Sequence, residues 1–205
     1  MNNYFKEISE IWDEYAKRIK EPDYLIKDGI DIRKAEEYFN TDHNKVLFIL
    51  KESNEESVDE NDRKCKSIFA DGGWFESYEA KRNDKKMITK MIKMYNYIQN
   101  QSVATKSQPV SAADRYIFAF ININKHGNGK YTSETKKIEE ALEKDAELLK
   151  RQIKALQPDV IVWGVKALED KFKKLVYSDN EISKAKLIVT CHFSVLKYED
   201  FEKEI

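Results

Sequence analysis

Four short apolar runs constrain the fold of this chain more tightly than any other feature. They are "KVLFIL" at 45–50, "YIFAFI" at 116–121, "DVIVWG" at 159–164 and "KLIVTC" at 186–191. Each run is too short for an ordinary helix, and each is continuously apolar, which is typical of strands that are covered on both faces. The runs therefore predict four strands of a parallel sheet.

Helical periodicity fills the stretches around these runs. Apolar residues recur at helical spacing in 84–100 and again in 133–157, where Ser133 can cap the start and Pro158 follows the end. Residues 1–40 read as two amphipathic helices interrupted around "EPDYLIKDGID". Strands that alternate with helical crossovers predict an α/β fold, here a three-layer sandwich with a central four-stranded parallel sheet flanked by helices. The N-terminal helices are expected to pack on this unit.

Length and composition set broad limits on the protein. A chain of 205 residues favours one domain, 1–205, with 1–40 as a helical extension. Because 36 basic residues nearly balance 37 acidic ones, total charge gives no bias towards nucleic acid, although a local basic face is compatible with it. The start "MNNYFKEISEIW" lacks a signal-peptide pattern, no apolar run is long enough to span a membrane, and two isolated cysteines suit a reducing compartment. We therefore expect a cytoplasmic protein without a membrane association.

The predicted sheet indicates where a ligand should bind. In parallel α/β sheets, ligands bind at the carboxyl ends of the strands. The stretches that follow the four runs are "KESNEE", "NINKHGNGK", "WGVKA" and "CHFSVL", and together they contain most of the candidate site residues. The sequence therefore predicts that these stretches meet at one edge of the sheet.

The stretch "CHFSVL" at 191–196 supplies three of the candidates. His192 can bind a ligand or act as an acid or base near neutral pH, and a histidine that ties down the strand end is an equally good explanation. Ser194 can contact a phosphate or cap a following helix. Leu196 is either ordinary core or an apolar wedge that unstacks a base pair.

Two asparagines mark the end of the second run, in "ININK" at 121–125. An amide offers both a donor and an acceptor, which suits reading the Watson–Crick edge of a base, and local capping of the strand end is the alternative. We expect Asn122 and Asn124 to point in different directions, so that only one of them, Asn122, reads the base. Lys125 opens "KHGNGK", which suits the approach to a phosphate of DNA and is also typical of an ordinary turn.

Two further stretches add candidates. Glu52, in "KESNEE", is the carboxylate best placed to orient a water molecule. Trp74 and Phe75, in "DGGWF", can form a stacking platform for a base or can belong to a core that closes over a turn. No metal site is expected.

Taken in order, these stretches resemble the uracil-DNA glycosylase superfamily over about residues 45–200. "FININK" is similar to the base-reading strand of that superfamily, and "EKDAELLKRQIKALQPDVIVWGVKAL" looks like its long helix and the Pro-x-Val-Ile-Val strand that follows. "CHFSVL" is similar to its His-Pro-Ser motif. The resemblance implies that Asn122 reads the base, His192 faces it, Ser194 contacts DNA and Leu196 enters the duplex.

The sequence also departs from the pattern of the superfamily. Phe193 replaces the proline of the His-Pro-Ser motif. The first motif of the superfamily is of the Gly-x-x-Pro type, whereas "KESNE" stands at that place, with Glu52 where some branches carry a glutamate. The branches with an iron–sulfur cluster use four cysteines, and this chain has only Cys65 and Cys191, so we expect no cluster and no other cofactor.

The resemblance implies a DNA glycosylase-like hydrolase that flips out and excises uracil or another altered base from DNA. Asn122 would read the base, Trp74 or Phe75 would stack on it, His192 would stabilise charge on the leaving base, and Glu52 would position water. The altered first motif favours an alternative, a module on the same fold that binds a nucleic acid or nucleotide without cleaving it. A hydrolase of free nucleosides or nucleotides is a third interpretation.

Overall fold

The computed structural model describes residues 2–18, 27–52, 85–99, 117–125 and 134–191. Short 3-10 and π turns link several elements and are named where they matter. The main elements, in chain order, are helices and strands with these bounds: α1 Asn2–Arg18, α2 Ala35–Asn40, β1 Val46–Glu52, α5 Lys85–Ile98, β2 Phe118–Asn124, α6 Thr135–Leu156, β3 Val160–Trp163, α7 Glu169–Phe172 and β4 Lys186–Val189.

The four strands form one parallel sheet in the order β2-β1-β3-β4. The register places Phe48 of β1 between Phe120 of β2 and Val162 of β3. All four apolar runs are strands, so the predicted four-stranded parallel sheet is confirmed. The strands are continuously apolar because both faces of the sheet are covered.

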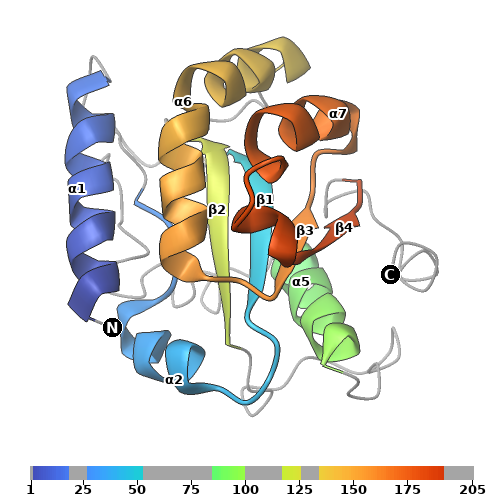
Figure 1. Ribbon diagram of the computed structural model, residues 1–205. Coiled ribbons are helices and arrows are strands. Elements are labelled where there is room, and N and C mark those ends of the chain that lie inside the picture. Colours follow the sequence, from blue (N-terminus) through green and yellow to red (C-terminus); the bar gives the residue numbers. More distant parts are fainter. Residues whose placement is uncertain (1, 19–26, 53–84, 100–116, 126–133, 192–205) are drawn as a thin grey trace, which may run out of the picture.

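Helices cover the two faces of the sheet (Figure 1). On one face, Trp163 of β3 stacks on Phe172 of α7, with ring centroids 4.0 Å apart, and α1 and α6 cover the neighbouring strands. On the opposite face, the ring of Phe118 packs against those of Phe48 and of Tyr95 on α5, with ring centroids 4.9 Å and 5.8 Å apart. The result is the predicted three-layer α/β sandwich.

Helix α6 follows from its sequence pattern. The apolar residues at helical spacing are all buried in the structure: Ile138, Leu142, Leu149, Ile153 and Leu156. The helix ends because Gln157 adopts a left-handed conformation (φ 48°) and donates its backbone N–H to the carbonyls of Ile153 and Lys154. At the other end, Glu134 occupies the N-cap position without a side-chain hydrogen bond, and the predicted cap Ser133 lies outside the described residues.

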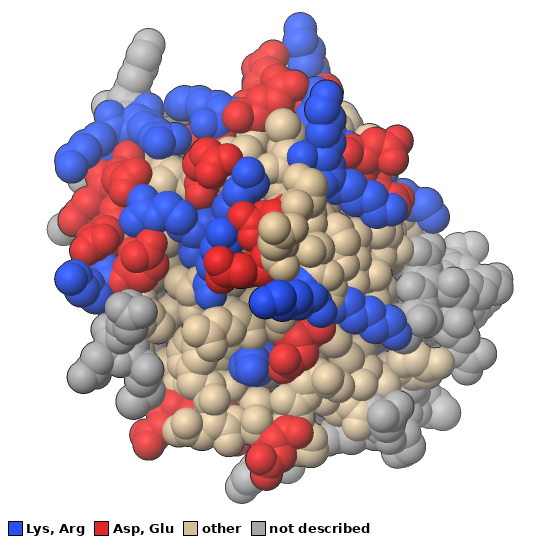
Figure 2. Space-filling view, viewed as in Figure 1, with Lys and Arg blue, Asp and Glu red and all other residues tan. Residues whose placement is uncertain are grey.

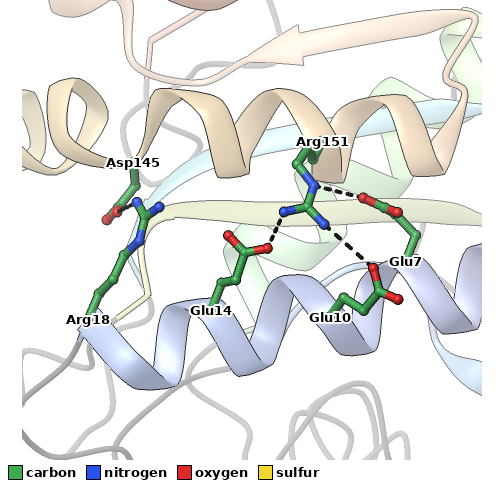
Figure 3. A network of polar contacts seen from close by, with 6 residues as sticks. All are labelled: Glu7, Glu10, Glu14, Arg18, Asp145 and Arg151. Atoms are coloured by element: carbon green, nitrogen blue, oxygen red, sulfur yellow. Dashed lines mark hydrogen bonds and ion pairs between the residues drawn. The ribbon is translucent and has the colours of Figure 1, made fainter.

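Both predicted N-terminal helices are present, and α1 packs against α6. Tyr4, Ile8, Ile11, Trp12 and Tyr15 of α1 are buried in the shared core. At the rim of this contact, Arg151 of α6 binds Glu7 (2.8 Å), Glu14 and Glu10 (3.9 Å) of α1 (Figure 3). The apolar face of α1 therefore joins the core, and ion pairs surround it.

The segment between α1 and α2 closes the outer edge of the sheet. Strand β2 is an edge strand, and Gly29 forms an antiparallel bridge with Phe120, whose backbone N–H donates to the Gly29 carbonyl at 3.0 Å. Gly29 has a φ of 139°, where an L side chain is strained, and an added Cβ would lie 3.0 Å from the Tyr4 hydroxyl. A glycine is thus suited to this close approach. No helix among the described residues is long and apolar enough to cross a membrane.

Candidate functional site at the carboxyl edge of the sheet

The carboxyl ends of the four strands meet at one edge, as the sequence predicts. Asn122 of β2 lies beside Leu50 of β1, and one residue pair further on Asn124 lies beside Glu52. Gly164 continues this edge after β3, with its backbone N–H donating to the Ile49 carbonyl at 2.9 Å. Thr190 continues it after β4, with its N–H donating to the Trp163 carbonyl at 2.9 Å. The register thus aligns Asn122, Leu50, Gly164 and Thr190 in one row.

Asn122 has the properties of a ligand-binding group. Its side chain lies on the same face of β2 as those of Phe118 and Phe120, which is the face covered by α5, because side chains alternate along a strand. The residue is only 2 % exposed, yet its side-chain amide forms none of the hydrogen bonds between described residues. The amide is not among the fully buried groups without a partner in the described part of the chain, which include Oγ1 of Thr190.

Thr190 presents a buried hydroxyl group in the same row. It is fully buried, and its Oγ1 has no hydrogen-bond partner within the described part of the chain. Alternation places it on the same face of β4 as Ile188, which corresponds to the face of Asn122. Thr190 was not predicted as a site residue, although a polar residue at the carboxyl end of a buried strand indicates such a position.

One prediction about the asparagines was wrong. Asn122 and Asn124 are two residues apart on a regular strand, so their side chains lie on the same face instead of diverging. They differ in burial, since Asn124 is half-buried at the end of the strand and has a partner of its own. Asn122 is therefore still the better candidate for a base reader. Glu52 lies beside Asn124 in the backbone register, while its side chain lies outside the described residues.

Lys125 corrects a second prediction. Its side chain is buried, and its ammonium binds the Asp28 carboxylate at 2.8 Å and 3.1 Å. The ammonium also lies 5.4 Å from the centre of the Trp12 ring and 5.7 Å from that of Tyr15, both on α1. Burial lowers the pKa of Lys125, and the attraction of Asp28 opposes that shift. Lys125 is thus part of the protein interior and not the DNA contact that we expected.

The Asp28 carboxylate is the centre of a buried polar cluster. It is fully buried and accepts hydrogen bonds from the Lys125 ammonium, from Nε2 of Gln152 on α6 (2.8 Å) and from the backbone N–H of Asn122 (2.6 Å). We call these side chains of Asp28, Lys125 and Gln152 the Asp28 cluster. The cluster joins α6 and the segment before α2 to the carboxyl end of β2.

The Asp28 cluster was missed in the sequence. One signal for it was Gln152, a polar residue in the apolar stripe of α6 beside Leu149, Ile153 and Leu156. A polar residue on the buried face of a helix requires a polar partner nearby. The partner, Asp28, is 124 residues away along the chain, so the sequence does not reveal it.

The remaining candidates lie outside the described residues. These are the predicted residues His192, Ser194, Leu196, Trp74 and Phe75. The last described residues are Thr190 and Cys191, at the carboxyl end of β4. They immediately precede the stretch that contains His192, Ser194 and Leu196. Within the described ranges no group of three His, Cys, Asp or Glu side chains is placed to hold a metal ion.

The face covered by α1, α6 and α7 differs in character from this edge. Figure 2 shows that acidic and basic side chains are interleaved on that face. Several of its lysines are in ion pairs: Lys171 binds Glu139 and Glu143, and Lys154 binds Asp179 at 2.8 Å. A surface of mixed sign gives little attraction for a phosphate backbone.

None of the protein-family models, curated proteins or solved structures with which the chain was compared matches it.

Proposed function

We propose that the carboxyl edge of the sheet binds a nucleobase and that the protein is a DNA glycosylase-like hydrolase, which excises uracil or another altered base. The observation that carries the proposal is the position of Asn122, which lies at the carboxyl end of β2, is only 2 % exposed and forms no side-chain hydrogen bond with another described residue. An amide in this position can offer a donor and an acceptor to a ligand. A nucleobase presents adjacent donors and acceptors that complement an amide.

The proposed reaction is hydrolysis of the bond between the base and C1′ of the sugar. The target nucleotide leaves the base stack, and Asn122 binds the edge of its base. The bonding electrons depart with the base, and His192 stabilises the growing negative charge. Glu52 orients the water and takes one of its protons as the oxygen bonds to C1′, and the released base takes up a proton from solvent. Trp74 or Phe75 stacks on the base, while Ser194 and Leu196 contact the DNA. All of these roles apart from that of Asn122 rest on the resemblance in sequence.

A binding module without catalytic activity is the second candidate. The stretch "KESNE" after β1 differs from the first motif of the glycosylases. This difference favours recognition of a base without cleavage. Asn122 serves either function equally well.

A base-release assay separates the two candidates. The substrates are single- and double-stranded oligonucleotides that carry uracil, hypoxanthine or xanthine, and the variants are Asn122→Ala and His192→Ala. Release by the native protein that falls by on the order of 10²–10³ in His192→Ala supports the hydrolase. Salt-sensitive binding that requires Asn122, without any release, supports the binding module. Absence of both release and binding contradicts base recognition.

A further inference from the structure

The backbone of Asn122 is held by a side chain from a remote part of the sequence. Because β2 is an edge strand, its outward N–H groups need partners other than a neighbouring strand of the sheet. The N–H of Phe120 donates to the backbone carbonyl of Gly29, whereas the N–H of Asn122 donates to the Asp28 carboxylate at 2.6 Å. The contact thus changes from a backbone acceptor to a side-chain acceptor at Asn122, the residue proposed to bind the base.

The Asp28 carboxylate is itself tightly fixed. One oxygen, Oδ1, accepts from Lys125 Nζ and from Gln152 Nε2, each at 2.8 Å. The other, Oδ2, accepts from the Asn122 N–H and lies 3.1 Å from Lys125 Nζ. Asp28 therefore contacts β2 both at Asn122 and at Lys125, so it brackets the carboxyl end of the strand.

A gain in the stability of the fold does not explain why an ion pair is buried at this place. Removing two charges from water is costly, and well-packed apolar residues are often as stable as a buried ion pair. Directional bonds do, however, hold a backbone in one place, which apolar packing does not. The Asp28 carboxylate lies on the face of the sheet that α1 and α6 cover, whereas the Asn122 side chain lies on the face that α5 covers. The Asp28 cluster can therefore hold the Asn122 backbone without obstructing a ligand.

We propose that Asp28 is a positioning residue, whose carboxylate holds the backbone of Asn122 so that its amide meets the base in the reactive geometry. This inference rests on the proposed base-binding role of Asn122. A displacement of about 1 Å at a reacting group costs on the order of 10² in rate. Loss of the Asp28 acceptor should therefore affect kcat more than KM, since contacts to the DNA backbone remain.

Two double variants isolate the acceptor at position 28. D28N/K125M and D28L/K125M both remove the two charges, and their side chains at position 28 have the same number of heavy atoms and the same branching. Only asparagine keeps an oxygen that accepts from the Asn122 N–H, and its amide nitrogen can donate to Gln152 Oε1, which has no partner among the described residues. Asp31→Asn is the matched control, because Asp31 is also buried on this segment but binds Arg33 at 2.7 Å.

The experiment measures kcat and KM for base release, and circular dichroism confirms folding. We expect kcat of D28L/K125M to be lower than that of D28N/K125M by on the order of 10², with similar KM values and an unaffected Asp31→Asn control. Equal kcat values in the two folded double variants, whether high or low, would overturn the positioning role. If D28L/K125M does not fold, Gln152→Leu is the second variant. It removes one donor to the carboxylate and should lower kcat about tenfold, while an unchanged kcat would again overturn the inference.

Failure of the two proposals is distinguishable. A native protein that neither releases nor binds any of the bases contradicts the proposed function, and the positioning role falls with it. An active native protein whose double variants have equal kcat values contradicts only the role of Asp28.

Discussion

At the scale of single residues, Asn122 is a polar residue that is only 2 % exposed and whose side-chain amide forms no hydrogen bond with another described residue. Leucine at this position would replace a nearly buried polar group by an apolar one, and a polar group that is buried without a partner costs about 1–3 kcal/mol. We expect Asn122→Leu to leave the free energy of unfolding unchanged or to raise it, while base release or binding is lost. Urea unfolding and the base-release assay measure the two quantities. A clearly less stable variant would show that the amide has a structural role instead.

Lys125 allows a second prediction at this scale. Lys125→Met leaves the Asp28 carboxylate buried without its cation, and breaking one partner of a buried pair costs about 3–5 kcal/mol. The double variant D28N/K125M removes both charges and should lose less stability than the single variant. Urea unfolding of both proteins tests this order. A single variant that is as stable as the double variant would contradict the buried ion pair.

Asp31 gives a prediction about pH. Burial alone raises the pKa of its carboxyl group, but hydrogen bonds from the Arg33 side chain and backbone outweigh burial, so the pKa lies below the ordinary value of 3.8. Because the pKa is lower in the folded state, the pair stabilises the fold above pH 3.8, and this stability is lost as the pH falls through the folded pKa.

The variant Arg33→Gln removes the side chain that lowers this pKa. We expect the pKa of Asp31 to rise, and the acid-induced loss of stability below pH 4 to become smaller. Carboxyl-carbon NMR titration of Asp31 in the native protein and in the variant measures the shift. The same pKa in both proteins would show that Arg33 does not govern this carboxylate.

At the scale of elements, α1 is held by its apolar face more than by its ion pairs. Ile8 is fully buried, and Ile8→Ala should cost about 2–5 kcal/mol through lost contacts and the cavity left behind. Arg151 and its glutamate partners are about one-third exposed or more, so water and salt screen their attraction. We expect Arg151→Gln to cost only a small fraction of the loss in Ile8→Ala. Urea unfolding at low and high salt tests this, and a comparable loss in both variants would contradict it.

The elements themselves could largely be predicted from the sequence. The strands and α6 were found because burial imposes a pattern on the residues, with continuous apolar runs in β1 and β2 and helical spacing in α6. The short helix α7 and the π turn Lys173–Tyr177 that follows it were not predicted. These short elements are held by isolated apolar contacts, such as that of Phe172 with Trp163, so their sequences contain no periodic pattern. Strand order was also not predicted, since nothing local distinguishes one buried neighbour from another.

At the scale of the whole molecule, the edge that carries the candidate site could be predicted, but the side chains that support it could not. The carboxyl ends of parallel strands must share an edge, so Asn122 and Glu52 were expected to lie at the same edge of the sheet, and the structure places them on neighbouring strands. The Asp28 carboxylate binds residues that are 94 to 124 positions away along the chain, and no local pattern encodes such a contact. Lys125 was mistaken for a surface residue because its neighbours in the sequence resemble an exposed turn, while its partner Asp28 is remote in the sequence.

NMR of the Asn122 side-chain amide measures whether a base binds at this residue. The measurement follows the two N–H signals of this amide in labelled protein while free uracil, hypoxanthine or xanthine is added, with Asn122→Leu used to assign them. We expect one of these bases to shift the Asn122 signals in a saturable manner, because the base supplies hydrogen-bond partners to the amide. Signals that stay unchanged while every base is added to excess would show that Asn122 does not bind a base.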